Sequence, residues 1–160
     1  MGLDRDQLLE KLRTGAPVVG VIGLGYVGLP LSLAFATKGV SVIGFDIDDE
    51  KNEALARGES YLTTVAGSEV KSTIDAGTFS ATSDFSKLGE CDVILICVPT
   101  PLGESREPDL KYVRMTSEQI AGELRAGQLV VLESTTYPGT TEEILRDVLE
   151  RSGLKCGKDF

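Results

Sequence analysis

A glycine-rich turn with the sequence GLGYVG spans residues 23–28 and directly follows an apolar run, residues 18–22. The apolar run predicts a buried strand, and the apolar pattern after the turn predicts a helix. In such a turn Gly23 permits the tight bend, Gly25 leaves room for a pyrophosphate, and Gly28 lets the helix pack close to the strand. The N–H groups and the positive dipole end of the helix favour phosphate oxygens. The sequence therefore predicts a dinucleotide site at this turn.

A second apolar run ends at Asp46, 18 residues after Gly28. At that spacing an acidic side chain accepts hydrogen bonds from the ribose hydroxyls of the adenosine. A carboxylate also repels a 2′-phosphate, and residues 47–49 contain no arginine to offset this effect. We therefore expect NAD rather than NADP as the cofactor. Lys51 follows closely and is either an adenosine contact or a solvated helix residue.

Strand and helix patterns alternate along the 160 residues. The predicted strands are residues 18–22, 40–45, 79–82, 93–98 and 129–132, and the predicted helices are residues 3–12, 27–39, 48–57, 66–76, 84–88 and 109–127, with a last helix from Thr140. This order specifies a parallel sheet covered on both faces. We expect an α/β fold, a Rossmann-type doubly wound parallel sheet in a single domain over residues 17–160, with residues 1–16 as an N-terminal helical extension. A sixth strand would begin at residues 158–160, so we expect the front portion of a longer protein, truncated near that strand.

Three of the predicted helices carry more specific signals. The helix after the glycine turn has four apolar residues at helical spacing, which predict its buried face: Val27, Leu31, Ala34 and Phe35. The N-terminal helix has three leucines on one side: Leu8, Leu9 and Leu12. In the last helix, Thr140 and Glu143 have the spacing of a capping box.

Charge and composition exclude several classes of function. A net charge of −9 and a pI near 4.5 argue against nucleic acid or an anionic membrane as partner. No apolar run approaches the roughly 20 residues of a membrane span, and the first residues are too polar for a signal peptide. The three cysteines, Cys91, Cys97 and Cys156, lack metal-type spacing, and the chain has no histidine. We expect free thiols in a cytoplasmic protein without a metal site.

Two further loops reach the edge of the predicted sheet where ligands bind, beyond the carboxyl ends of the strands. They are residues 98–103 after the fourth strand and residues 133–140 after the fifth. Thr100 and Thr136 follow buried strands on this side, and their hydroxyls can donate to or accept from a ribose or a carboxamide. Both are candidate cofactor contacts. For Thr135 and Thr140, turn chemistry or helix capping is the favoured interpretation.

Five motifs, GLGYVGLPL, GFD, VPTPL, REPDL and ESTTYPGTTEE, occur in this order. From Val18 to the C-terminus they resemble the NAD-binding domain of the nucleotide-sugar 6-dehydrogenases, the UDP-glucose and GDP-mannose dehydrogenase family. VPTPL, REPDL and LESTTYPGTT look closest to the UDP-N-acetylglucosamine 6-dehydrogenase branch, with the UDP-N-acetylmannosamine branch next.

The resemblance implies an oxidoreductase of polysaccharide biosynthesis that oxidises the C6 hydroxyl of a UDP-sugar to the uronic acid with two NAD+. It assigns five residues to the pyrophosphate: Gly23, Gly25, Tyr26, Val27 and Gly28. It assigns Asp46 to the ribose and Lys51 to the adenosine. Thr100 and Thr136 come to the nicotinamide side, and Thr136 matches a threonine that helps position the catalytic water.

The same resemblance places the family's nucleophilic cysteine and its lysine in a later domain, beyond Phe160. None of the three cysteines of this chain matches that motif, so we expect the chain to bind NAD without turning over by itself. Family members generally dimerise through their middle region. We therefore expect a homodimer for the full-length protein, whereas this chain alone can be a monomer.

Three interpretations stay open. The chain is the cofactor half of a UDP-N-acetylglucosamine 6-dehydrogenase, or of the corresponding enzyme for UDP-N-acetylmannosamine or UDP-glucose. Alternatively, it belongs to another two-domain dehydrogenase of hydroxy acids or sugar acids, against which VPTPL and ESTTYPGTT count. As a third interpretation, it is a stand-alone, non-catalytic NAD-binding module, against which the missing sixth strand counts.

Overall fold

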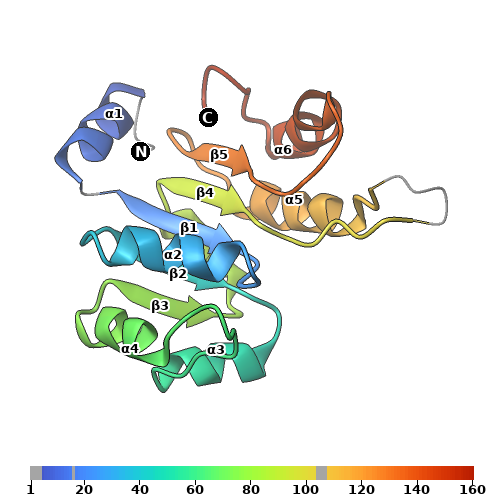
Figure 1. Cartoon of the computed structure of the whole chain (residues 1–160). Helices are drawn as coiled ribbons and strands as arrows, with labels where there is room; N and C mark the ends of the chain where they lie inside the picture. Colours follow the sequence, from blue (N-terminus) through green and yellow to red (C-terminus); the bar gives the residue numbers. More distant parts are fainter. Residues whose placement is uncertain (1–4, 16, 104–107) are drawn as a thin grey trace.

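The computed structural model describes residues 5–15, 17–103 and 108–160. Within them, five parallel strands form one sheet in the order β3-β2-β1-β4-β5. The strands are β1 (Val18–Ile22), β2 (Ser41–Phe45), β3 (Phe79–Thr82), β4 (Val93–Ile96) and β5 (Leu129–Leu132). The chain runs outward from β1 to β3 and then crosses to the other side of β1, which is the expected doubly wound arrangement (Figure 1). Leu3, and Arg106 and Glu107 of the REPDL motif, lie outside the described residues.

The connections between the strands are mostly helical. They and the terminal segments contain α1 (Arg5–Thr14), α2 (Gly28–Ala36), α3 (Asp49–Ala56), α4 (Gly67–Asp75), the 3₁₀-helix η1 (Phe85–Glu90), α5 (Lys111–Glu123), the π-helical turn η2 (Thr141–Leu145), α6 (Arg146–Leu149) and the 3₁₀-helix η3 (Glu150–Ser152). The predicted helices are therefore present. In the described part of the chain, no helix has both the length and the apolar character of a membrane span.

Alternate residues of each central strand pack into two separate apolar cores. On β4, Val93 and Leu95 belong to the core that contains α2, α3 and α4, whereas Ile94 and Ile96 belong to the core that contains α5, η2 and α6. Successive side chains of a strand point to opposite faces of the sheet. A strand covered on both faces is therefore apolar without interruption, and all four residues of β4 are buried.

Helix α2 buries a different face from the one predicted. Val27 and Ala34 are exposed, and Leu31 and Phe35 are only half-buried. The buried side consists of Gly28, Leu29, Ser32, Leu33 and Ala36. Because α2 has no charged residue, its sequence contains no polar side that would reveal the orientation. The orientation follows instead from Gly28, which packs directly against the backbone of the glycine turn.

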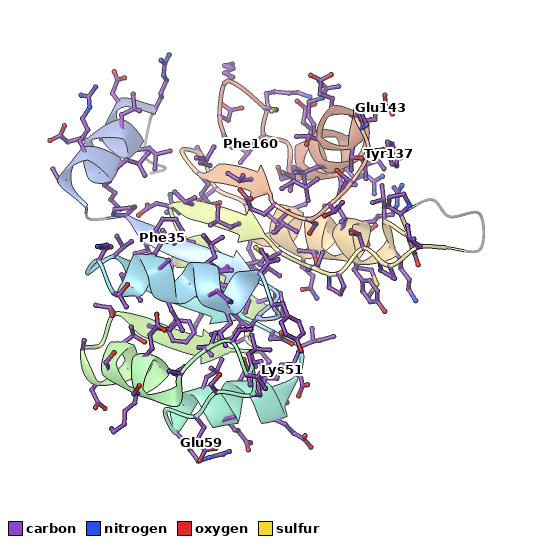
Figure 2. All side chains as sticks on the ribbon, viewed as in Figure 1. Phe35, Lys51, Glu59, Tyr137, Glu143 and Phe160 are labelled. Carbon is purple, nitrogen blue, oxygen red and sulfur yellow. The ribbon has the colours of Figure 1, made fainter. Side chains whose placement is uncertain are left out.

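The last helix begins with the wide turn η2, and the predicted capping box is absent. Thr140 has helical dihedral angles, φ −52° and ψ −41°, which differ from the extended backbone of an N-cap. Its buried Oγ1 donates to the carbonyl of Tyr137 at 2.8 Å. The N–H of Glu143 donates to the carbonyl of Gly139 at 2.8 Å. Gly139 has φ 97°, so the left-handed bend at this glycine starts the helix. Figure 2 shows Tyr137 and Glu143 at this end of the helix.

Helix α1 lies beside the sheet and contacts it through few side chains. Leu8 packs half-buried against the first core, but Leu9 and Leu12 are exposed, so only part of the predicted apolar side is used. The Nζ of Lys11 donates to both carboxylate oxygens of Asp92 at 2.9 and 3.0 Å. This ion pair ties α1 to the start of β4.

Asp92 is fully buried at the amino-terminal edge of the sheet, opposite the glycine turn. Besides the Lys11 ammonium, its carboxylate accepts from the N–H of Val18 at 2.9 Å and from the Nη2 of Arg125 at 3.0 Å. Burial alone would raise the pKa of Asp92, but these donors hold the pKa below its ordinary value. The carboxylate thus connects α1, β1, β4 and the segment before β5.

Candidate cofactor site

The carboxyl ends of the strands border a cavity of about 670 Å³. Its lining comes from the glycine turn, the end of β2, the start of α3, the loops after β4 and β5, and α5. In doubly wound sheets, ligands bind at this edge, where the strand order reverses, here between β1 and β4. The volume lies within the range of about 300–1,000 Å³ of small-molecule sites.

Seven of the nine predicted cofactor residues line this cavity: Gly23, Gly25, Tyr26, Val27, Asp46, Lys51 and Thr100. Gly28 and Thr136 are not part of the lining. Gly28 is buried behind the turn, and Thr135, the neighbour of Thr136, lines the cavity in its place. The structure therefore brings together four of the five residues predicted for the pyrophosphate, the residues predicted for the ribose and the adenosine, and one of the two threonines predicted for the nicotinamide.

The three glycines of the turn have different surroundings. Gly23 has φ 92°, a left-handed conformation that a side chain disfavours. A Cβ on Gly28 would lie 1.8 Å from the carbonyl oxygen of Gly23, so only glycine allows this close packing. Apart from Gly25 itself and its two neighbours in the chain, no heavy atom of the described residues lies within 4 Å of the position that a Cβ on Gly25 would take. The space in front of Gly25 is therefore open to a ligand.

The backbone of the turn offers free hydrogen-bond donors. In the described residues, the N–H groups of residues 25–28 have no backbone acceptor, and α2 begins at the last of them, Gly28. Free N–H groups and the positive end of a helix dipole together bind anions such as a pyrophosphate. This part of the site therefore fits the predicted cofactor.

Asp46 connects the end of β2 to the glycine turn. Its side chain is almost fully buried, with Oδ2 accepting from the N–H of Leu24 at 2.9 Å and Oδ1 accepting from the N–H of Asp48 at 3.0 Å. Oδ2 also accepts from the Nζ of Lys51 at 3.5 Å, whereas Oδ1 has a single donor and can accept a further hydrogen bond. Asp46 is thus fixed beside the turn with acceptor capacity left for ribose hydroxyls.

Lys51 projects from the first turn of α3 near this carboxylate (Figure 2). Its Nζ lies 3.5 Å from Oδ2 of Asp46 and 5.8 Å from the ring centroid of Tyr61. The side chain of Asp48 caps α3 by accepting from the N–H groups of Glu50 and Lys51. This cap fixes the first turn of α3 and places Lys51 at the cavity.

Ser134 joins the loops that follow β4 and β5. Its Oγ donates to the carbonyl of Val98 at 2.8 Å, and its N–H donates to the carbonyl of Ile96 at 3.1 Å. These bonds hold the two loops together, so that Thr100 and Thr135 line the same cavity.

Cys97 lies at the end of β4 and also lines the cavity. Burial, together with the nearby Glu133 carboxylate, raises the pKa of Cys97 to about 11. The side chain is therefore a neutral thiol near neutral pH and a poor nucleophile. Within the described residues, no group of three or more His, Cys, Asp or Glu side chains is placed to hold a metal ion.

The wall that α5 contributes was missing from the sequence analysis. Tyr112, Met115 and Gln119 line the cavity from this helix, and Tyr112 and Met115 are 41% and 53% exposed. Two large apolar side chains outside the core face of an amphipathic helix were the available signal, because exposed apolar surface often marks a binding site.

The parallel sheet, the glycine turn and the acid at the end of β2 define a dinucleotide-binding domain of the Rossmann type. More narrowly, the chain belongs to the UDP-glucose/GDP-mannose dehydrogenase family, because residues 18–160 match the model of its NAD binding domain. The resemblance inferred from the motifs is confirmed, and NAD is the cofactor of this domain.

Named relatives agree with this assignment. A UDP-N-acetyl-D-glucosamine 6-dehydrogenase of Pseudomonas aeruginosa is 42% identical over 143 residues, which cover 89% of this chain and 33% of that protein. A UDP-N-acetyl-D-mannosamine dehydrogenase of Salmonella typhi is 41% identical over 127 residues, 79% of this chain and 30% of that protein. The crystal structure of an NDP-N-acetyl-D-galactosaminuronic acid dehydrogenase from Methanosarcina mazei Go1 superposes with a TM-score of 0.87 at 34% identity, covering 99% of this chain and 36% of that one. The chain therefore spans about a third of the length of these relatives.

Proposed function

We propose that this chain supplies the NAD site of an enzyme that oxidises the C6 hydroxyl of UDP-N-acetylglucosamine to the carboxylate. Family membership supports the dehydrogenase chemistry, and the 42% identity to a UDP-N-acetyl-D-glucosamine 6-dehydrogenase supports the branch. Oxidation of an alcohol to a carboxylate removes four electrons and needs one oxygen atom from water. Each NAD+ accepts two electrons, so the proposed reaction consumes two NAD+ for each sugar.

The observation that carries the proposal is the hydrogen bond between Asp46 and the N–H of Leu24, 2.9 Å long. It places the proposed ribose acceptor directly beside the glycine turn. We assign the ribose hydroxyls to Asp46, the pyrophosphate to the free N–H groups of residues 25–28, and the adenosine side to Lys51. Thr100 is assigned to the nicotinamide side, because it lines the cavity in the loop after β4.

Residues 17–160 are proposed to form the cofactor domain, with residues 1–16 as a helical extension. Thr136 is proposed to position the catalytic water, an assignment supported by its place in the ESTTYPGTTEE motif. The family resemblance implies that the nucleophilic cysteine and the lysine belong to a later domain. None of the three cysteines of this chain matches the motif of that cysteine. We therefore propose that the chain alone is catalytically inactive, and that the whole enzyme is a homodimer.

The cofactor assignment is tested by calorimetric titration of the chain with NAD+ and, separately, with NADP+. We expect wild-type protein to prefer NAD+ by at least about tenfold, or about 1.4 kcal/mol. The preference should disappear in Asp46→Ala, because the carboxylate that accepts from the ribose and repels a 2′-phosphate is gone. Asp49→Ala removes the same charge from an exposed position outside the cavity lining, and its preference should match that of the wild type.

Two results would contradict the cofactor assignment. A wild-type preference for NADP+ would show that Asp46 does not face the ribose 2′ position. Absence of binding for both dinucleotides would show that this chain does not hold the cofactor unaided.

The choice of sugar is tested on the full-length enzyme with UDP-N-acetylglucosamine, UDP-N-acetylmannosamine and UDP-glucose. We expect the highest kcat/KM with UDP-N-acetylglucosamine and the formation of two NADH for each sugar consumed. A higher kcat/KM with UDP-N-acetylmannosamine would assign the protein to that branch, which the 41% identity to a UDP-N-acetyl-D-mannosamine dehydrogenase also supports.

A further inference from the structure

Tyr61 lies outside the strand–turn–helix motif, but its side chain reaches the glycine turn. Tyr61 belongs to the loop between α3 and α4, 37 residues after Leu24, and its hydroxyl donates to the Leu24 carbonyl at 2.5 Å. The N–H of Leu24 is bound by Asp46 at 2.9 Å. Both backbone groups of Leu24 are therefore held by side chains from other segments.

The bond to the Leu24 carbonyl also fixes the direction of the next N–H group. The carbonyl of Leu24 and the N–H of Gly25 belong to one planar trans peptide, in which they point in opposite directions. With the carbonyl held by Tyr61, the N–H of Gly25 points away from Tyr61. The carbonyl would be the acceptor for the N–H of Gly28 in a continuous α-helix, but that bond is not formed. The free N–H groups of the turn therefore depend on the orientation that Tyr61 imposes.

The loop that carries Tyr61 is itself anchored. Leu62 and Val65 are buried in the core that contains α2, α3 and α4. The Oγ of Ser60 donates to the carbonyl of Leu62 at 3.0 Å and accepts from its N–H at 3.2 Å. Since the residues on both sides are fixed, the tyrosine ring has a defined position.

The ring and the hydroxyl of Tyr61 have separate contacts. The ammonium group of Lys51 lies 5.8 Å from the ring centroid, within the distance of a cation–π contact. Burial, and the carboxylates of Asp46 and Asp48, raise the pKa of Tyr61 above its ordinary value. The hydroxyl therefore keeps its proton, and remains a donor, throughout the physiological pH range.

We propose that Tyr61 is a positioning residue of the cofactor site, which orients the Leu24–Gly25 peptide for the pyrophosphate and supports Lys51 on its ring. The proposal rests on the assignment of the glycine turn to the pyrophosphate. Tyr61 touches the turn and Lys51, so its effect on the cofactor is exerted through them.

The test uses Tyr61→Phe, which removes the hydroxyl and keeps the ring. Tyr137→Phe is the matched control, because Tyr137 is exposed and lies outside the cavity lining. NMR hydrogen exchange in the ligand-free chain reports the Leu24 amide, with the amide of Ile94 in the buried strand β4 as the reference for global unfolding. Calorimetry then measures the Kd for NAD+.

In Tyr61→Phe, we expect exchange of the Leu24 amide to accelerate about three- to tenfold more than that of Ile94, the range expected for one lost hydrogen bond. The Kd for NAD+ should rise by a similar factor, about three- to tenfold. Tyr137→Phe should match the wild type in both measurements.

Equal acceleration at Leu24 and Ile94 would show that Tyr61 only stabilises the fold, which would overturn the proposal. An unchanged Kd for NAD+ in Tyr61→Phe would overturn it as well. Failure of the wild-type chain to bind NAD+ would contradict the proposed cofactor assignment, and hydrogen exchange would then decide alone whether Tyr61 orders the turn.

Discussion

Alanine at Gly25 and alanine at Gly28 should separate ligand binding from folding, although the two glycines lie in the same turn. Neither glycine has a left-handed φ, so alanine can adopt both backbone conformations. A Cβ at Gly25 meets no atom within 4 Å, whereas a Cβ at Gly28 would lie 1.8 Å from the Gly23 carbonyl oxygen. We therefore expect Gly25→Ala to fold normally and lose NAD+ affinity, and Gly28→Ala to lose stability.

The magnitudes follow from these surroundings. An extra methyl group in a packed site costs about 1–3 kcal/mol, occasionally more, and a backbone oxygen cannot rotate aside, so we expect about 3 kcal/mol for Gly28→Ala. For a chain of this length, that corresponds to a fall in Tm of about 6–12 °C. Gly25→Ala restricts the unfolded chain without a clash, so its Tm should be unchanged or higher by about 2–4 °C.

The effect of Gly25→Ala should appear in the cofactor titration. If the pyrophosphate approaches this glycine as closely as proposed, the added methyl group costs about 1–3 kcal/mol of binding free energy, which raises the Kd for NAD+ about 5- to 150-fold. Thermal unfolding by circular dichroism and calorimetric titration measure the two quantities on the same samples. Wild-type affinity in Gly25→Ala would refute the placement of the pyrophosphate, and a wild-type Tm in Gly28→Ala would refute the close packing.

Two further predictions concern groups outside the turn. Asp92→Asn leaves Lys11 and Arg125 without their buried anion. Because both cations are partly exposed, we expect the free energy of unfolding to fall by about 3 kcal/mol, the lower end for a broken buried ion pair. Urea unfolding measures this loss. The pKa of Asp92 is lowered in the folded state. Its carboxylate therefore contributes fully to the free energy of unfolding above the ordinary carboxyl pKa, and this contribution is lost below about pH 4. Asp92→Asn should lose less stability than the wild type over that pH range, and equal losses in the two proteins would contradict this. Because burial raises the pKa of Cys97 to about 11, iodoacetamide should alkylate Cys97 near neutral pH more slowly than the exposed Cys156. Mass spectrometry of the labelled peptides measures both rates, and faster labelling of Cys97 would be inconsistent with its burial.

The sequence predicted those features that depend on neighbouring residues. The glycine turn and the spacing to Asp46 are both defined within about one strand–turn–helix unit. Strand β4 was recognisable because burial on both faces leaves an uninterrupted apolar run. These local signals were enough for the doubly wound fold and for most of the cavity lining.

The buried face of α2 and the start of the last helix could not be predicted in the same way. The prediction of the buried face of α2 was wrong because a helix without charged residues has no polar side. The orientation of α2 depends instead on the backbone contact of Gly28. The capping box at Thr140 was wrong because the left-handed Gly139 leads into a wide first turn. Both features depend on backbone geometry, which the pattern of residue types does not predict.

Contacts between distant segments were also missed. Tyr61 reaches Leu24 across 37 residues, and Lys11 reaches Asp92 across 81 residues. No periodic pattern or motif connects such pairs. The residues of α5 that line the cavity were missed for a related reason, because helix periodicity identifies the core face and does not show what the remaining faces meet.

The bond between Asp46 and Leu24 links cofactor preference to the order of the turn. The carboxylate proposed to exclude a 2′-phosphate is also the acceptor for a buried N–H group. Replacing Asp46 by a small neutral residue would remove the repulsion and, at the same time, leave that donor unpaired, at a cost of about 1–3 kcal/mol. A change to NADP in a protein of this kind therefore requires two simultaneous gains, a partner for the additional phosphate and a new acceptor for the turn. Single substitutions at this position should weaken dinucleotide binding more readily than they redirect it.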